Sequence, residues 1–298
     1  MRLNKLSPKD RPLFDKFLRI SRHDLAVYSF ENIFIWKKLF SIEWALKRDH
    51  LCVFFRDKIG CFLYLAPLGK EIKAQVIDEI FRVMDKFNKN KEISRIENIE
   101  EKDTGLYRSL GLAVKEKSLD YLCLREDLAG LRTDKFKSKR ASYNYFTKNY
   151  KSEYLCYRAS HKNGCLKLYH LWMHQRMQGN RGELYQGMLL DSLRTFQVML
   201  DDYRKLKLEG RAVRIGKEIK AFTFGYRLND DTFCILYEIT DLTIKGLAQF
   251  IFREFSRDLK GYTYINIMDD SGLENLKKVK LSYQPVKFVP AYIAKRKS

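Results

Sequence analysis

Segments with the apolar spacing of a helix alternate with segments typical of strands along the whole 298-residue chain. This alternation is the strongest constraint on the fold. Residues 9–20 and 70–87 place apolar side chains three and four positions apart, as an amphipathic helix does. Residues 51–56 and 232–238 are short runs rich in aliphatic and aromatic side chains, which is typical of buried strands. We therefore predict an α/β (α+β) fold with mixed, mostly antiparallel sheets flanked by helices.

The length and the order of the elements predict two domains. A chain of 298 residues suits two hydrophobic cores of roughly 150 residues each. We place an N-terminal domain at residues 1–130 and a C-terminal domain at residues 131–298, with one sheet in each. The expected elements include helices at residues 30–40, 135–150 and 183–206, and strands at residues 113–117 and 121–124.

The sequence lacks the features of a membrane-spanning or secreted protein. Its longest apolar stretches, at residues 61–67 and 233–237, are far shorter than the roughly 20 residues that span a bilayer. The first residues lead directly into a polar amphipathic stretch, without the apolar core of a secretory signal. We therefore expect a cytoplasmic protein. Its cysteines lie in apolar segments and form no C-x-x-C pair, so we expect buried free thiols.

Positive charge is concentrated in two stretches of the chain. The formal net charge is +20. Counting Lys and Arg against Asp and Glu gives +9 for residues 131–180 and +6 for residues 271–298. Such a concentration of charge is expected of a protein that binds a polyanion, either nucleic acid or an anionic membrane surface. Binding to an anionic membrane would hold the protein at the inner membrane face. The alternative is a lysine-rich surface that serves only solubility.

The sequence of residues 134–150 predicts a helix that packs against the protein with one side and presents cations on another. Four aromatic side chains, Phe136, Tyr143, Phe146 and Tyr150, fall on one side of this helix. A second stripe, at spacings of three or four, consists of Lys137, Arg140, Asn144 and Lys148. Arginine makes fork-shaped contacts to phosphate, lysine supplies point charges, and tyrosine can stack on bases or sugars. A solvated charged face without any function is the alternative.

Two other segments place carboxylates at the ends of apolar strands. Glu238 ends an apolar run, where an unpaired charge is costly, so it either has a cation partner or has a raised pKa that suits a general base. Residues 264–272 place Asn266, Asp269 and Asp270 after an apolar strand, a common position for a catalytic or ligand-orienting cluster. Each aspartate could equally cap a helix and have no chemical role.

Motifs for several other kinds of chemistry are absent from the sequence. His170 and His174 lie four apart on a predicted helix, but the glutamate of H-E-x-x-H is missing and no second ligand pair accompanies them, so we expect no metal site. The sequence also lacks G-x-x-x-x-G-K-[ST], G-x-G-x-x-G and G-x-S-x-G. The sequence therefore contains none of the motifs that usually indicate nucleotide hydrolysis, dinucleotide redox chemistry or serine hydrolase chemistry.

An ordered set of residues runs through nearly the whole chain. It comprises Ser29-Phe30, Asn32 and Trp36, then Asp120-Tyr121, then Lys139-Arg140, Asn144 and Phe146, then Tyr237-Glu238 and Gly246, then Asn266, Asp270 and Gly272, and finally Lys278, Lys280, Ser282-Tyr283 and Pro285. In this order the set resembles the phosphatidylglycerol lysyltransferase C-terminal domain family. The chain departs from the residues usual in that family at Ala141, Ile239, Ile267 and Met268.

The resemblance implies two tandem GNAT-type domains and a function in aminoacyl transfer. The aminoacyl group would pass from a charged tRNA to an acceptor such as phosphatidylglycerol or another anionic lipid, with tRNA as a partner and no bound cofactor. Ordinary GNAT enzymes hold the coenzyme A pyrophosphate on a [QR]-x-x-G-x-[GA] turn at a helix N-terminus. Residues 240–246 read TDLTIKG and do not match that turn, so coenzyme A is the less favoured donor.

The implied reaction needs a base, an oxyanion donor and groups that position both substrates. We assign Glu238 or Asp270 as the base or acceptor-orienting group, and Lys280 and Tyr283 as donors to the oxyanion. The substrate-binding set comprises Lys137, Lys139 and Arg140 as phosphate contacts, together with Asn144, Asn266, Asp269, Lys278 and Ser282. Two alternatives stay open: an acetyl-coenzyme A dependent N-acetyltransferase, and a non-catalytic module that binds RNA or an acidic membrane.

Overall fold

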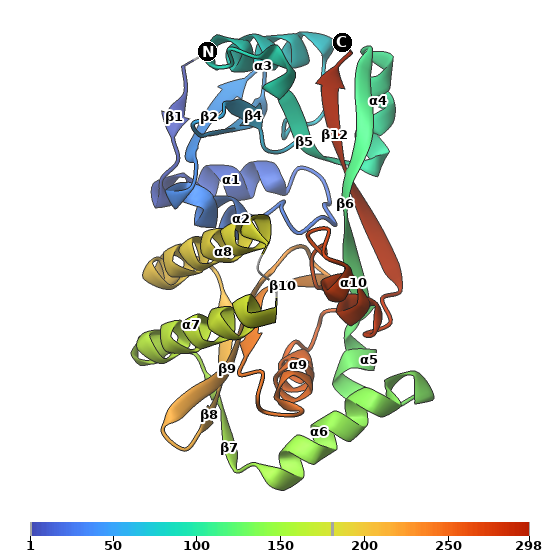
Figure 1. Cartoon of the computed structure of the whole chain (residues 1–298). Helices are drawn as coiled ribbons and strands as arrows, with labels where there is room; N and C mark the ends of the chain where they lie inside the picture. The colour runs from blue at the N-terminus through green and yellow to red at the C-terminus, as the bar shows by residue number, and fades with distance from the viewer. Residues whose placement is uncertain (1, 180–181, 298) are drawn as a thin grey trace. The chain divides into compact units, whose positions relative to one another are not determined.

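The computed structural model describes residues 2–179 and 182–297, and the chain divides into two compact units (Figure 1). Unit 1 consists of Met1–Asp120, Asp269–Leu273 and Phe288–Ser298, and unit 2 consists of Tyr121–Met268 and Glu274–Lys287. The end of the chain therefore belongs to the same unit as its beginning. The two units interleave in sequence, whereas the predicted domains, 1–130 and 131–298, are continuous. The predicted boundary between residues 130 and 131 stays a prediction.

Unit 1 is a sheet with helices. The strand order is β1-β2-β3-β4-β5-β12, in which β4 and β5 pair in parallel and the other neighbours are antiparallel. The strands are β1 (Asn4–Lys5), β2 (Ser41–Lys47), β3 (His50–Arg56), β4 (Cys61–Leu63), β5 (Arg95–Glu100) and β12 (Lys287–Arg296). The helices are α1 (Arg11–Leu18), α2 (Phe30–Phe34), α3 (Ala74–Phe87) and α4 (Thr104–Ser109). The strand β6 (Leu112–Leu124) contributes residues to both units.

The core of unit 1 follows from the helical period that the sequence shows. On α3, Val76, Ile80 and Phe81 are buried and pack against Phe54 of β3 and Ile96 of β5. Side chains three or four positions apart lie on one face of a helix, so α3 covers the sheet with a continuous apolar stripe. The amphipathic helix expected at residues 70–87 is confirmed, with its first turn at Ala74.

Unit 2 contains the strand order β6-β11-β10-β9-β8-β7. Its β10–β11 pair is parallel, and the other pairs are antiparallel. The strands are β7 (Ser152–Cys156), β8 (Glu209–Ile215), β9 (Glu218–Arg227), β10 (Thr232–Thr240) and β11 (Tyr264–Asn266). The helices are α5 (Arg125–Gly130), α6 (Lys137–Asn149), α7 (Lys162–Gly179), α8 (Glu183–Asp201), α9 (Leu247–Asp258) and α10 (Glu274–Leu281).

Helices cover both faces of the unit 2 sheet (Figure 1). Ala221 of β9 packs with Leu247 and Ile251 of α9. The next residue, Phe222, stacks on Phe196 of α8 with 4.8 Å between the ring centroids. Successive side chains of a strand point to opposite faces, so α8 and α9 lie on opposite faces of the sheet. Both units thus show the mostly antiparallel sheets flanked by helices that the sequence predicts.

Strand β10 changes its pairing halfway along its length. It pairs with β11 only as far as Cys234, opposite Asn266, and then continues to Thr240. On its other side, the register with β9 shifts between Ile235 and Tyr237. A β-bulge of this kind bends the strand and re-aims the side chains that follow it. The second half of β10 therefore extends beyond β11 with a changed side-chain direction.

Several elements differ from the sequence prediction. The two strands expected at residues 113–117 and 121–124 form one strand, β6, and the helix expected at 30–40 continues as a 3-10 turn after Phe34. The prediction missed α5, because this helix has six residues and buries only Leu128, which is too little for a periodic signal. The helix expected at 183–206 ends at Asp201.

Two sequence expectations concern the environment of the chain. All six cysteines are free, as expected, but Cys156 is exposed rather than buried, because it belongs to the edge strand β7. Among the helices of the described residues, none combines the length and hydropathy that a bilayer crossing requires.

Helix α6 packs against the start of α9 at a glycine. Gly246 is the N-cap residue of α9 and has a φ of +83°. A methyl group at this position would lie 2.1 Å from the main-chain oxygen of Ser142 and 3.0 Å from Cβ of Phe146, both on α6. Two backbones approach this closely only where no side chain intervenes, so Gly246 allows α6 to cover the N-terminus of α9.

We predict that Gly246→Ala destabilises the protein far more than Gly216→Ala. Gly216 lies in the turn between β8 and β9 with a φ of +60°, and a methyl group there would meet nothing within 4 Å. Gly216→Ala should cost about 1 kcal/mol of unfolding free energy from its backbone conformation alone, and Gly246→Ala roughly 3 kcal/mol or more because it adds a clash. Urea unfolding of both variants measures the difference. Equal losses would show that α6 does not press on Gly246.

Candidate active site

Glu238 lies on the part of β10 that follows the bulge. Its cross-strand neighbour on β9 is Thr223. Burial raises the pKa of the Glu238 carboxyl to about 8, and the Thr223 hydroxyl opposes this only in part. Within the described residues, the buried Oε2 atom of Glu238 has no hydrogen-bond partner. Of the two alternatives that the sequence left open, the structure therefore favours a raised pKa over pairing with a cation.

Tyr283 approaches the same carboxyl from the segment that follows α10. It is buried, and its ring meets Phe252 of α9 edge-on with 4.6 Å between the centroids. Burial raises the pKa of the Tyr283 phenol, and the nearby Glu238 carboxylate raises it further, against a smaller opposing effect of Gln249. The phenol therefore stays protonated at any physiological pH and can donate a hydrogen bond.

Lys139 of α6 contacts Tyr283. Its Nζ atom lies 4.2 Å from the centroid of the Tyr283 ring, a cation–π contact. Burial lowers the pKa of Lys139. We call Glu238, Tyr283 and Lys139 the Glu238 cluster. It combines a carboxyl with a raised pKa, a neutral phenol and a partly buried ammonium, each from a different segment of unit 2.

Lys280 and Asn266 both contact the turn after β11, and the roles predicted for them in catalysis and substrate binding stay predictions. Lys280 is buried, and its Nζ atom donates hydrogen bonds to the main-chain oxygens of Ile267 and Met268. The Asn266 side chain accepts a hydrogen bond of 2.7 Å from the Met268 amide. Met268 has a φ of +61°, in the left-handed region that side chains rarely adopt. Both residues thus support the turn after β11.

Asp269 and Asp270 belong to unit 1 and organise the turn that contains them. The Asp269 carboxylate accepts a hydrogen bond from the Ser271 amide at 2.9 Å, and the Asp270 carboxylate accepts one from the Gly272 amide at 2.9 Å. Helix α10 begins at Glu274, so neither aspartate is its N-cap residue, the alternative that the sequence left open beside a chemical role. These side-chain bonds to amides two residues on are typical of Asx turns.

Helix α6 has the two faces that its sequence predicts. Phe146 is buried, and Tyr143 stacks on Phe250 of α9 at 5.7 Å. Lys137 and Asn144 are exposed on the opposite side. Arg140 departs from this pattern, because its Nη1 atom donates hydrogen bonds to the main-chain oxygens of Leu131, Arg132 and Thr133. This part of its guanidinium therefore serves the end of α5.

Two further residues of the predicted substrate-binding set lie on or next to α10. Lys278 is exposed. The Ser282 hydroxyl donates a hydrogen bond of 2.6 Å to the main-chain oxygen of Val279. Neither has a contact that assigns it to the Glu238 cluster, so their roles stay predictions.

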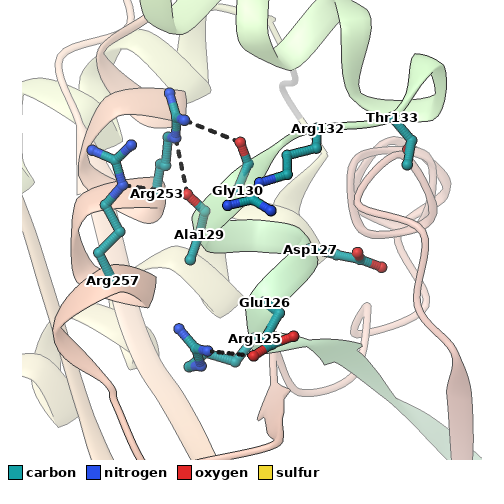
Figure 2. A pocket seen from close by; sticks show the side chains of 9 residues that line it. All are labelled: Arg125, Glu126, Asp127, Ala129, Gly130, Arg132, Thr133, Arg253 and Arg257. Carbon is teal, nitrogen blue, oxygen red and sulfur yellow. Dashed lines mark hydrogen bonds and ion pairs between the residues drawn. The ribbon is translucent and has the colours of Figure 1, made fainter.

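Unit 2 also contains an arginine-lined cavity of about 500 Å³, for which the sequence contains no signal (Figure 2). Its walls are Arg125, Glu126, Asp127, Ala129, Gly130, Arg132, Thr133, Arg253 and Arg257. We call it the α5 cavity, because most of these residues belong to α5 or follow it. Its arginines come from segments more than 100 positions apart, so only the folded chain brings them together.

The described residues hold no group of three or more His, Cys, Asp or Glu side chains that could bind a metal ion. His170 and His174 are both exposed on α7.

The fold places the chain among the tandem GNAT-like acyltransferase folds. A conserved protein of unknown function from Bacteroides thetaiotaomicron VPI-5482 is similar with a TM-score of 0.88 and 26% identity, over 100% of both chains. The C-terminal domain of a putative lysylphosphatidylglycerol synthetase from Agrobacterium fabrum has a TM-score of 0.68 and 11% identity, over 98% of this chain and 93% of that one. A tandem GNAT protein from the clavulanic acid biosynthesis pathway has a TM-score of 0.53 and 7% identity, over 100% and 99%.

The chain belongs to the phosphatidylglycerol lysyltransferase, C-terminal family, which it matches over residues 19–295. The resemblance inferred from the ordered set of residues is therefore confirmed. No curated protein matches the chain.

We predict that Glu238→Gln makes the protein more stable above about pH 5. At pH values below 4.5, the usual pKa of a glutamate, the carboxyl is protonated in both the folded and the unfolded chain. As the pH rises to about 8, the unfolded chain ionises while the folded chain keeps its proton, so the wild type loses stability, and above pH 8 the loss levels off. The glutamine variant avoids this loss of stability, which is on the order of 5 kcal/mol.

Urea unfolding between pH 4 and pH 9 measures this effect, and Glu153→Gln is the matched control. Arg214 lowers the pKa of the exposed Glu153 carboxyl, so this variant should lose a little stability at neutral pH instead of gaining it. A Glu238→Gln variant with the wild-type pH profile would show that the carboxyl ionises normally in the folded chain.

Proposed function

We propose that this protein is a transferase that moves an aminoacyl group from a charged tRNA to a hydroxyl of an acceptor, with phosphatidylglycerol or another anionic lipid as the acceptor class. The family and the similarity to a lysylphosphatidylglycerol synthetase domain support this proposal. The observation that carries it is the Glu238 cluster, in which a carboxyl with a pKa of about 8 lies beside the buried phenol of Tyr283. A carboxyl with a pKa near the working pH suits a general base.

In the proposed reaction, the ionised Glu238 carboxylate takes the proton of the acceptor hydroxyl while that oxygen attacks the carbonyl carbon of the aminoacyl ester. The tetrahedral intermediate carries its negative charge on the former carbonyl oxygen, and the Tyr283 hydroxyl donates a hydrogen bond to it. The ester bond to the tRNA ribose then breaks. The protonated Glu238 returns its proton to the leaving ribose oxygen, so the carboxylate is regenerated without any co-reactant.

Lys139 is the proposed substrate-positioning cation of the cluster. Its contact with the Tyr283 ring holds an ammonium next to the phenol, where it can attract the phosphate of a lipid headgroup or of the terminal nucleotide. We assign Lys137, Asn144, Lys278 and Ser282 to more peripheral substrate contacts. The segment after β11 is supported by four side chains, those of Lys280, Asn266, Asp269 and Asp270. The end of α5 is supported by Arg140.

The donor in this proposal is charged tRNA rather than coenzyme A. A GNAT enzyme would bind the pyrophosphate of coenzyme A at the helix N-terminus that follows the central strand, which corresponds to the start of α9. Here the backbone of α6 packs against Gly246 at that position. A donor that presents its phosphates elsewhere does not need this site.

We place the reaction at the cytoplasmic face of the membrane, since the acceptor is a lipid and the donor is a cytosolic RNA. The net charge of +20 would favour both an anionic membrane surface and RNA.

We predict that Glu238→Gln lowers the rate of aminoacyl transfer by about 100-fold or more, because glutamine has the same shape but cannot accept the proton. The wild-type kcat/KM should rise with pH and level off above about pH 8, where the carboxyl is ionised. Purified protein, bulk charged tRNA and phosphatidylglycerol vesicles are incubated between pH 6 and pH 9, and lipid products are counted by mass spectrometry. Glu153→Gln controls for the loss of a carboxylate elsewhere in unit 2, and full activity of Glu238→Gln would remove Glu238 from the mechanism.

We predict no saturable micromolar binding of coenzyme A or acetyl-coenzyme A, because α6 covers the N-terminus of α9. Isothermal titration calorimetry measures this directly. Tight binding of either compound would favour an N-acetyltransferase and contradict the assignment of tRNA as the donor.

A further inference from the structure

The walls of the α5 cavity are polar and charged. Four of its lining residues are arginines, two are carboxylates, and Ala129 is the largest aliphatic side chain among them. A volume of about 500 Å³ is in the range of sites that bind nucleotide-sized ligands. A lipid chain or an apolar metabolite would find no complementary surface here, whereas an anionic group would meet guanidinium groups on several sides.

Neutral acceptors hold Arg253 in place and bind one side of Arg257, whose Nη1 atom also pairs with the Glu254 carboxylate at 2.7 Å. Arg253 donates to the main-chain oxygens of Ala129 at 3.1 Å and Gly130 at 3.0 Å, and Nε of Arg257 donates to Ala129 at 3.3 Å (Figure 2). These carbonyls close α5 and need partners of this kind. A carbonyl fixes the plane of a guanidinium but does not cancel its charge. Arg253 uses Nε and Nη2 in these bonds, so its Nη1 stays available to a ligand.

The arginines around the cavity also repel one another electrostatically. Burial lowers the pKa of Arg253, and the positive charges of Arg257 and, to a smaller extent, Arg140 lower it further, against opposing effects of Tyr143 and Glu254. Arg125 is bound to the exposed Glu126 and to the main-chain oxygen of Tyr262. The exposed Arg132 side chain has no hydrogen bond or ion pair with any described residue. A bound anion would relieve this like-charge repulsion.

We propose that the α5 cavity is a phosphate-binding site for the RNA backbone, with Arg132 and Arg253 as its principal donors. This inference rests on the proposed function, because it takes the tRNA donor as the source of the phosphate. RNA is favoured over a lipid surface since the cavity walls lack large apolar side chains. In addition, the exposed cations Lys135 and Lys137 follow Thr133 in the chain, so positive charge continues from the cavity rim along α6, as a row of phosphates requires.

Fluorescence anisotropy with labelled, uncharged bulk tRNA tests the site at several salt concentrations. We expect Arg132→Gln to weaken binding roughly fivefold and to reduce the salt slope by about 0.7 to 0.9, the value of one lost phosphate contact. Arg132→Glu should weaken binding more, and Arg132→Lys should retain most of it. The matched control is Lys217→Gln, which removes an exposed cation from the β8–β9 turn of the same unit, outside this cavity. Thermal unfolding of each variant verifies that it folds.

Three results would overturn the inference in distinguishable ways. If the wild type binds tRNA and transfers aminoacyl groups, but both Arg132→Gln and Arg132→Glu bind as tightly as Lys217→Gln, the phosphate site lies elsewhere and the proposed function stands. If Arg132→Glu loses sedimentation with phosphatidylglycerol vesicles and keeps its tRNA affinity, the cavity serves the membrane. If the wild type neither binds tRNA nor transfers, the proposed function fails together with this site.

Discussion

The cost of burying the Glu238 carboxyl shapes the chemistry of unit 2. A carboxylate without a cation partner or a full set of hydrogen bonds is expensive in a protein interior, so the group holds its proton up to a pH of about 8. Glu238 follows the bulge in β10, where this strand has passed the end of β11, and its carboxylate lies near enough to Tyr283 to raise the pKa of that phenol. The fold therefore maintains an acid that is unfavourable for stability, which is characteristic of functional sites.

Four cations near the candidate sites of unit 2 differ in what they contact. Lys280 and Arg140 donate to main-chain oxygens, so their hydrogen bonds support the turn after β11 and the end of α5. Lys139 lies over an aromatic ring, and Arg132 is exposed without a partner among the described residues, so their charges stay available. Charge counted along a sequence cannot separate these groups, because the carbonyl partners become apparent only in the folded chain.

The sequence predicted the parts of the fold that depend on periodicity. The apolar stripe of α3, the two faces of α6 and the buried runs of β3 and β10 all follow from spacing, and each is present. Glu238 and Tyr283 could be singled out because one ends an apolar run and the other belongs to the family pattern. The bulge in β10, the six-residue helix α5 and the arginines of the α5 cavity could not, since each depends on contacts between distant segments.

The proposed chemistry depends on the ionisation of one carboxyl, and this ionisation can be measured directly. Carbon-13 NMR of protein labelled at the glutamate side-chain carboxyl, compared with Glu238→Gln to assign the resonance, follows the titration of Glu238 itself. We expect a titration midpoint of about pH 8 for this carboxyl. A midpoint near 4.5, the ordinary value for a glutamate, would mean that the carboxyl is ionised throughout the physiological range and would contradict the central claim.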